Sequence, residues 1–364
     1  MYSFEPDPEQ QMLVEAVGKY ASADMRPAAH EAEENHALPQ KMIDKGWELG
    51  LLQGSVSEAY GGFGEWSALT GVLAAEELAF GDLAGAFAVM TPALFATPIL
   101  LAGSDEQRHE FLPKVIAGAW KPYSAAFIEY AFDFDPNDLR TTAQLQDGEY
   151  SLSGEKAYVP FAREAEALLV YASLDGRTQG FIVPRDSAGL TVADDREKLL
   201  GLNALPLFRT KLKDVRVPAS NRLGGASGHD FELILAAMRL ASAATALGVA
   251  RAAFEYALDY AKEREAFGVK IAQKQAIAFM LAEMAMEVDA MRLLVWEAAW
   301  KLDRHEDATR EAYLAKRYAA DMALKITDNA LQVLGGHGYI RDHLVELFLR
   351  NARGFATLEG LAIA

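Results

Sequence analysis

The chain has 364 residues, of which 51% are hydrophobic and 24% charged, so it can bury sizeable cores and is not intrinsically disordered. Its 52 acidic residues outnumber the 35 basic ones, and the net charge of −17 argues against nucleic acid or anionic membranes as partners. The sequence has no cysteine, which excludes disulfides, thiolate metal ligands and cysteine nucleophiles.

Residues 1–121 are predicted to form a helical domain. Asp7-Pro8-Glu9 is typical of a helix start, because Asp caps, Pro suits the first turn and Glu complements the helix dipole. Ser104 is expected to cap a helix that runs to Ile116. The first residues are acidic and polar, unlike a signal peptide, and no run of about 20 apolar residues occurs. We therefore expect a cytoplasmic protein without a membrane span.

Residues 122–230 change to short runs rich in β-branched and aromatic residues. Two examples are ALLVY at 167–171 and GFIV at 180–183, and Asp147-Gly148 is a hairpin signal between apolar runs. The spacing of these runs predicts a β-barrel or β-sandwich.

Residues 231–364 return to a helical pattern that is rich in alanine. Leu, Met and Ala recur every three or four residues through 231–263, 273–302 and 307–334. This pattern predicts a C-terminal four-helix bundle whose broad apolar faces partly serve subunit contacts. The fold class is thus α+β, with helical, β and helical domains in that order.

Two segments near the ends of predicted helices could bind a ligand. Glycines in LGGHGY at 334–339 would let backbone N–H groups approach a phosphate, although composition alone favours a helix C-cap followed by a turn. In REAFG at 264–268, the Arg could contact a pyrophosphate and the Phe a ring, or both could be structural. His337 has no second histidine at metal-ligand spacing, so no metal site is predicted.

Glu359 lies between apolar residues in the segment TLEGL at 357–361. A carboxylate in apolar surroundings can act as a general base near neutral pH. The alternative reading is an ordinary exposed glutamate.

In order and spacing, several segments resemble the acyl-CoA dehydrogenase family across nearly the whole chain. The matching segments are EAYGGFG at 58–64, GEK at 154–156, the REAFG segment, Gln275-Ala276, QVLGGHGYIRD at 332–342, and Arg350-x-Ala352 nine residues before Glu359-Gly360. The resemblance implies FAD-dependent oxidation of an acyl-CoA thioester to a trans-2-enoyl-CoA. Electrons would then leave through an electron-transfer flavoprotein.

The same resemblance assigns roles to individual residues. Glu359 matches the base that removes the α-proton, and Arg239 matches an arginine near it. Some relatives carry the base just before that arginine, where this chain has Met238, which cannot act as a base. Gly360 would contact the substrate. Flavin contacts across a subunit interface are implied for Arg264, Phe267, Gln275, Gln332, Gly335 and Gly336.

The middle domain departs from the family pattern at the flavin and CoA contacts. Ile128 replaces a hydroxyl residue near the flavin, and Phe134 replaces a serine that binds the CoA ligand. Tyr158-Val159-Pro160 replaces Trp-Ile-Thr, and Pro160 offers neither a hydroxyl nor an N–H near the flavin. Each lost buried hydrogen bond costs on the order of 1–3 kcal/mol.

These departures leave several functions open. The first is an acyl-CoA dehydrogenase acting as a homotetramer. The second is a flavin-poor subunit of a heterotetramer with another dehydrogenase-like chain. A non-catalytic family member, or an oxidase that lets oxygen reach the flavin, remains as a further alternative.

Overall fold

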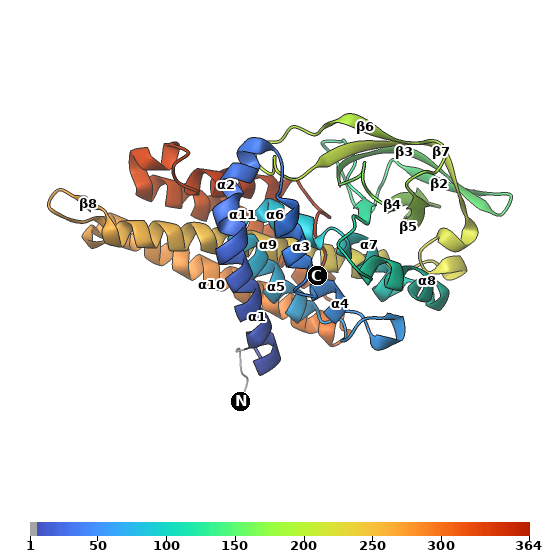
Figure 1. The fold of residues 1–364 in the computed structure, drawn as a ribbon, viewed down its shortest axis with the longest axis horizontal. Coiled ribbons are helices and arrows are strands. Elements are labelled where there is room, and N and C mark those ends of the chain that lie inside the picture. Colours follow the sequence, from blue (N-terminus) through green and yellow to red (C-terminus); the bar gives the residue numbers. More distant parts are fainter. Residues whose placement is uncertain (1–5) are drawn as a thin grey trace.

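A computed structural model describes residues 6–364, and the predicted order of helical, β and helical parts is confirmed (Figure 1). Residues 1–5 belong to the polar N-terminus considered above and lie outside the described residues. The first part contains α1 (Pro8–Tyr20), α2 (Arg26–Asn35), α3 (Gln40–Trp47), α4 (Leu51–Gly54), α5 (Ala68–Gly81), α6 (Leu83–Met90), α7 (Ala93–Ala102) and α8 (Asp105–Ile116).

Local sequence signals set several of these boundaries. Asp7 caps α1 by accepting a hydrogen bond from the backbone N–H of Gln10 at 2.9 Å, and the Gln10 side chain accepts one from the backbone N–H of Asp7. Ser104 caps α8 in the same way, as expected. Such capping boxes satisfy backbone donors that a helix start leaves unpaired.

The middle part forms a single seven-stranded sheet. Its path runs β1-β4-β2-β3-β7-β6, with β5 paired to the outer side of β4. The β2–β3 hairpin turns at Asp147-Gly148, and both residues have positive φ, as the two-residue turn requires. The strands are β1 (Ser124–Ala126), β2 (Thr142–Gln146), β3 (Glu149–Pro160), β4 (Ala167–Leu174), β5 (Arg177–Pro184), β6 (Leu190–Arg196) and β7 (Leu207–Pro218).

Three long helices dominate the C-terminal part: α9 (Phe231–Glu263), α10 (Gln275–Asp303) and α11 (Thr309–Leu334), followed by α12 (Val345–Ala352). A small hairpin of β8 (Glu265–Ala266) and β9 (Val269–Lys270) links α9 to α10 at the far tip of the bundle (Figure 1). α9 is long and apolar enough to cross a membrane, but 89% of its apolar window is buried inside the protein. It therefore serves as the core helix.

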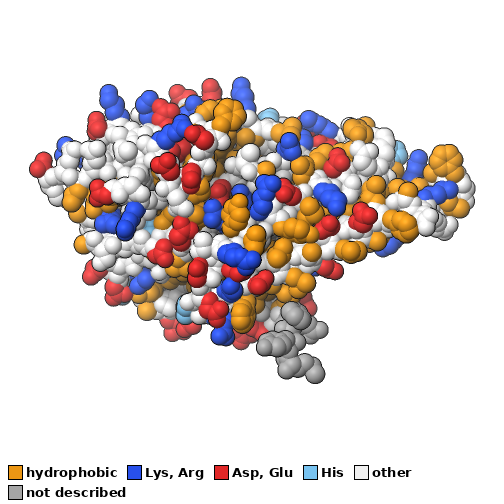
Figure 2. Space-filling model, turned by 180° about the vertical axis from the view of Figure 1, so that it is seen from behind, with side chains coloured by type: hydrophobic (Ala, Val, Ile, Leu, Met, Phe, Trp, Pro, Cys, Tyr) orange, Lys and Arg blue, Asp and Glu red, His pale blue; other side chains and the backbone are white. Residues whose placement is uncertain are grey.

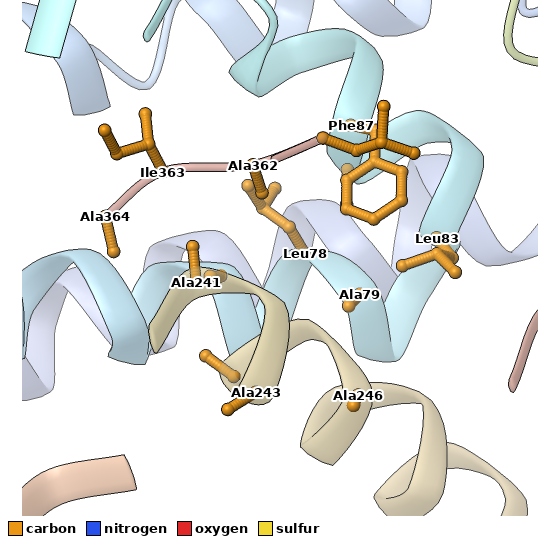
Figure 3. Close-up of a cluster of buried hydrophobic side chains, with 14 of the residues drawn as sticks. Leu78, Ala79, Leu83, Phe87, Ala241, Ala243, Ala246, Ala362, Ile363 and Ala364 are labelled. Carbon is orange, nitrogen blue, oxygen red and sulfur yellow. The ribbon is translucent and has the colours of Figure 1, made fainter. Parts of the chain in front are cut away.

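α5 also packs along α9, so the first helical part and the bundle share one core. Gly248 permits this close approach, because a Cβ there would lie 2.3 Å from the backbone oxygen of Glu76. Residues 361–364 run between α5, α6 and α9 and are buried (Figure 3).

Candidate active site

Glu359 lies in the loop that follows α12, and its side chain is buried. Gly360 shapes this loop, with φ at +75°, a region that favours glycine. A Cβ on Gly360 would also lie 2.4 Å from a ring carbon of Phe127. The glycine therefore acts through backbone conformation and close packing, and it fixes where the preceding carboxylate lies.

Arg239 on α9 binds the carboxylate of Glu359. Its Nε donates a hydrogen bond to Oε1 of Glu359 at 2.9 Å, and both side chains are largely buried. The surroundings of Glu359 are thus not purely apolar, because the arginine that the family resemblance implies near the base lies beside it. Among residues 6–364, no group donates a hydrogen bond to Oε2 of Glu359. One carboxylate oxygen is held, and the other is left without a protein donor.

A cavity of about 710 Å³ opens beside Glu359. This volume lies within the range of about 300–1,000 Å³ that is usual for small-molecule sites. Its walls come from the segment after β1, from β3, from the segment before β7, and from α11 and α12 with the following turn. The lining includes Ile128, Tyr130, Phe132, Phe134, Tyr158, Leu199, Leu202, Lys316, Arg350, Arg353, Leu358 and Glu359.

Four residues singled out in the sequence line this cavity together: Ile128, Phe134, Tyr158 and Glu359. Pro160 lies elsewhere, buried on β3, where it is paired with Leu207 of β7. The aromatic and aliphatic replacements thus make one wall of the cavity apolar.

Two cations on the cavity wall were not singled out by the sequence analysis. Lys316 of α11 and Arg353 form no ion pair or side-chain hydrogen bond with any residue from 6 to 364. The neighbouring Arg350 is different, because Glu33 and Glu346 bind its guanidinium at 2.6 and 2.7 Å. Lys316 and Arg353 therefore supply unneutralised positive charge beside an otherwise apolar wall. No local motif marks them, because only the fold brings them to Glu359.

A buried ion pair supports the wall behind the cavity. Lys156 donates to Oε1 of Glu129 at 2.9 Å and to the backbone oxygen of Phe127 at 3.0 Å. Burial lowers the pKa of Lys156 to about 8, against the opposing attraction of Glu129. Burial alone would raise the pKa of Glu129, but Lys156 and hydrogen bonds from Thr141 outweigh it, and the pKa is lowered. Lys156 belongs to the GEK segment at 154–156 that resembles the family, whereas its partner Glu129 becomes apparent only in the structure.

The remaining predicted flavin contacts lie at the opposite end of the bundle, around the β8–β9 hairpin and the end of α11 (Figure 1). Arg239 and Arg264 lie 25 residues apart on or next to α9, a separation of roughly 38 Å at the helical rise. Phe267 is 96% exposed, and no atom lies within 4 Å of a Cβ built on Gly335 or Gly336. One chain therefore does not bring this distal set to the cavity. The distal set comprises Arg264, Phe267, Gln275, Gln332, Gly335 and Gly336.

Family comparisons match the chain in three consecutive segments. The "Acyl-CoA dehydrogenase, N-terminal domain" matches residues 7–119, the middle domain matches 129–215, and the C-terminal domain matches 231–362. Together these matches cover most of the sequence.

Individual proteins agree with the domain matches. The "Probable acyl-CoA dehydrogenase YngJ" of Bacillus subtilis is 35% identical over 98% of this chain and 96% of its own length. The "Caffeyl-CoA reductase-Etf complex subunit CarC" of Acetobacterium woodii is 34% identical over 91% of this chain and 88% of its own. The solved butyryl-CoA dehydrogenase of Megasphaera elsdenii superposes with a TM-score of 0.89 at 30% identity, covering 97% of this chain and 95% of that one.

Proposed function

The chain belongs to the acyl-CoA dehydrogenase family, and we propose that it oxidises an acyl-CoA thioester to the trans-2-enoyl-CoA with Glu359 as base. It is an oxidoreductase of the acyl-CoA dehydrogenase type, and FAD is its cofactor. The observation that carries the proposed role of Glu359 is its position: a buried carboxylate with one oxygen fixed by Arg239, at the wall of the large cavity.

In this mechanism Oε2 of Glu359 accepts the α-proton of the thioester. Arg239 acts as a positioning residue, because its hydrogen bond to Oε1 orients the carboxylate without occupying the second oxygen. FAD, when bound, supplies the oxidising ring that receives the β-hydride. The apolar wall around Ile128 and Phe134 excludes water from the reacting carbons. Without water, the electrostatic interaction of the Glu359 carboxylate with the α-proton is stronger.

The residues present suit FAD in two separate places. The cavity beside Glu359 has an apolar and aromatic wall with Tyr158 and Ile128, suited to a flat ring system. Arg264, Gln275 and Gln332 of the distal set offer N–H donors suited to a diphosphate and an adenosine. Because the two places are far apart in one chain, the distal set of one copy would complete the site of another. Lys316 and Arg353 suit the phosphates of a nucleotide-bearing ligand.

We accordingly propose a homo-oligomer, with a tetramer as the expected form, and an electron-transfer flavoprotein as electron acceptor. The relative from Acetobacterium woodii is named as part of an Etf complex, which supports that acceptor class. A cytoplasmic location stays a prediction from composition. The replacement of a hydroxyl residue by Ile128, which lines the cavity, favours the second candidate, a flavin-poor subunit paired with another dehydrogenase-like chain.

The test compares the purified protein with Glu359→Gln in absorption spectra and turnover. We expect a flavin band that added acyl-CoA perturbs, and a fall in turnover of about 10²–10⁴-fold in the variant, the usual contribution of a general base. Glu110→Gln, an exposed glutamate on α8, serves as control and should leave turnover unchanged. A protein that takes up no FAD alone but does so with a dehydrogenase-like partner would favour the second candidate. Equal turnover in Glu359→Gln and wild type would contradict the assigned base.

A further inference from the structure

The segment 361–364, which follows directly after Glu359-Gly360, occupies the apolar interior between α5, α6 and α9. All four of its side chains are buried, and Figure 3 shows Ala362, Ile363 and Ala364 among Leu78, Leu83, Phe87 and Ala241. A Cβ on Gly71 of α5 would lie 3.2 Å from Ala364, so the fit on that side is close. The catalytic loop is thus continuous with a strip of chain threaded through the core.

Three spaces follow one another along this strip. The first is the main cavity with Glu359. The second is a throat of only about 10 Å³ between Leu83 and Phe87 on one side and Leu361 and Ala362 on the other. Leu202 and Leu358 line both the main cavity and the throat, so the two adjoin. A space of this size barely admits one water molecule, and an alkyl chain cannot pass.

Next along the segment lies a mostly apolar chamber of about 200 Å³, which is partly open to the surface at Phe63 and Glu65. Its walls include Trp47, Leu78 and Val89 from the first helical part, and Ile363 and Ala364 from the segment 361–364. The segment therefore separates the cavity that holds the base from a second apolar space.

We propose that Leu361 in the throat and Ile363 in the chamber next to it set the acyl-chain length that this enzyme accepts, by blocking the way from the Glu359 cavity into the second apolar space. The inference rests on the proposed function, because the carbon that loses its proton must lie against Glu359. An alkyl chain attached to that carbon is stabilised when it extends into apolar surroundings, because its surface leaves water. The closed throat stops this extension after a few carbons, so a short acyl chain fits and a long one does not.

The test measures kcat/KM for butyryl-CoA and octanoyl-CoA in wild type and in Leu361→Ala/Ile363→Ala. Wild type should strongly prefer butyryl-CoA. Opening the throat should raise the octanoyl-to-butyryl ratio by about tenfold or more, because the additional methylenes become buried. The matched control is Leu212→Ala/Ile326→Ala, which removes the same atoms from buried sites outside the three spaces and should leave the ratio unchanged.

A second variant, Phe87→Ala, opens the throat from the α6 side and leaves the sequence of residues 359–364 unchanged. It should shift the octanoyl-to-butyryl ratio in the same direction. Calorimetry in a Glu359→Gln background measures the affinity for each thioester without turnover. It therefore separates the effect of acyl-chain length on binding from its effect on the reaction. The throat variants could shift the affinity ratio while the enzyme with Glu359 intact turns over neither thioester. That result would support the length limit and overturn the proposed reaction. Unchanged ratios in both throat variants, or equal use of both thioesters by wild type, would overturn the length limit while leaving the oxidation intact.

Discussion

The buried pair of Lys156 and Glu129 shows how one contact supports the candidate site from behind. Lys156 is 0% and Glu129 6% exposed, and the carboxylate also accepts hydrogen bonds from the backbone N–H groups of Arg140 and Thr141. Glu129 precedes the aromatic segment that forms one cavity wall. The pair therefore ties β3 to that wall, and its geometry matters more than its net energy.

We expect Lys156→Met to destabilise the protein by about 3–5 kcal/mol, because it leaves the Glu129 carboxylate buried without its cation. The double variant Glu129→Gln/Lys156→Met should recover most of that loss, since it buries no uncompensated charge. Urea unfolding of the two variants and wild type measures both effects. If the single and double variants unfold at the same urea concentration, the pair does not play this role.

At the scale of secondary structure, Asp82 has an unusual environment for a helix cap. It begins α6 by accepting a hydrogen bond from the backbone N–H of Gly85 at 2.7 Å, and it is buried. Burial raises its pKa from 3.8 to about 7, against the opposing effect of the capping hydrogen bonds, and Glu33 raises it further. The N-terminus of α6 is thus capped by a carboxyl group whose burial favours the protonated form.

The sign of the resulting pH dependence follows from proton linkage. Between about pH 4 and pH 7 the folded protein keeps a proton on Asp82 that the unfolded chain has lost. The contribution of Asp82 to the free energy of unfolding therefore falls as pH rises through this window. Asp82→Asn keeps a capping oxygen and removes the titration.

We expect Asp82→Asn to be more stable than wild type at pH 8 by at least about 1 kcal/mol, or roughly 2–4 °C in Tm. The difference should shrink or reverse at pH 4. Thermal unfolding at both pH values measures it, and Asp7→Asn at the exposed cap of α1 controls for loss of a capping carboxylate. A constant difference at the two pH values would contradict the assigned protonation.

The sequence predicts such elements best where their signals are local. Asp7, Ser104 and Asp147-Gly148 act through neighbours within three residues, and the structure confirms all three. The Arg239–Glu359 pair spans 120 residues, and only the family resemblance placed the two together. The segment 361–364 carries no periodic pattern, because its burial depends on the space left between helices that come from both ends of the chain.

At the scale of the whole molecule, the separation of the distal set from the cavity requires contact between copies if one flavin is to use both. α10 offers a surface for that contact. Phe279, Met286, Leu293 and Trp300 follow each other at intervals of seven residues, and each is at least half exposed. This spacing is typical of a seam between packed helices. Figure 2 shows hydrophobic side chains spread along the tapered helical arm among charged ones.

We therefore expect Leu293→Glu to lower the molecular mass of the assembly in sedimentation, because it places a charge in the middle of the seam. If the distal set of one copy completes the flavin site of another, as proposed, flavin content should fall together with the mass. Leu145→Glu on β2 is the matched control, because that leucine is similarly exposed but lies on the sheet, and it should change neither mass nor flavin content. A monomeric wild type that binds a full complement of FAD would show that the distal set and the cavity do not share a flavin.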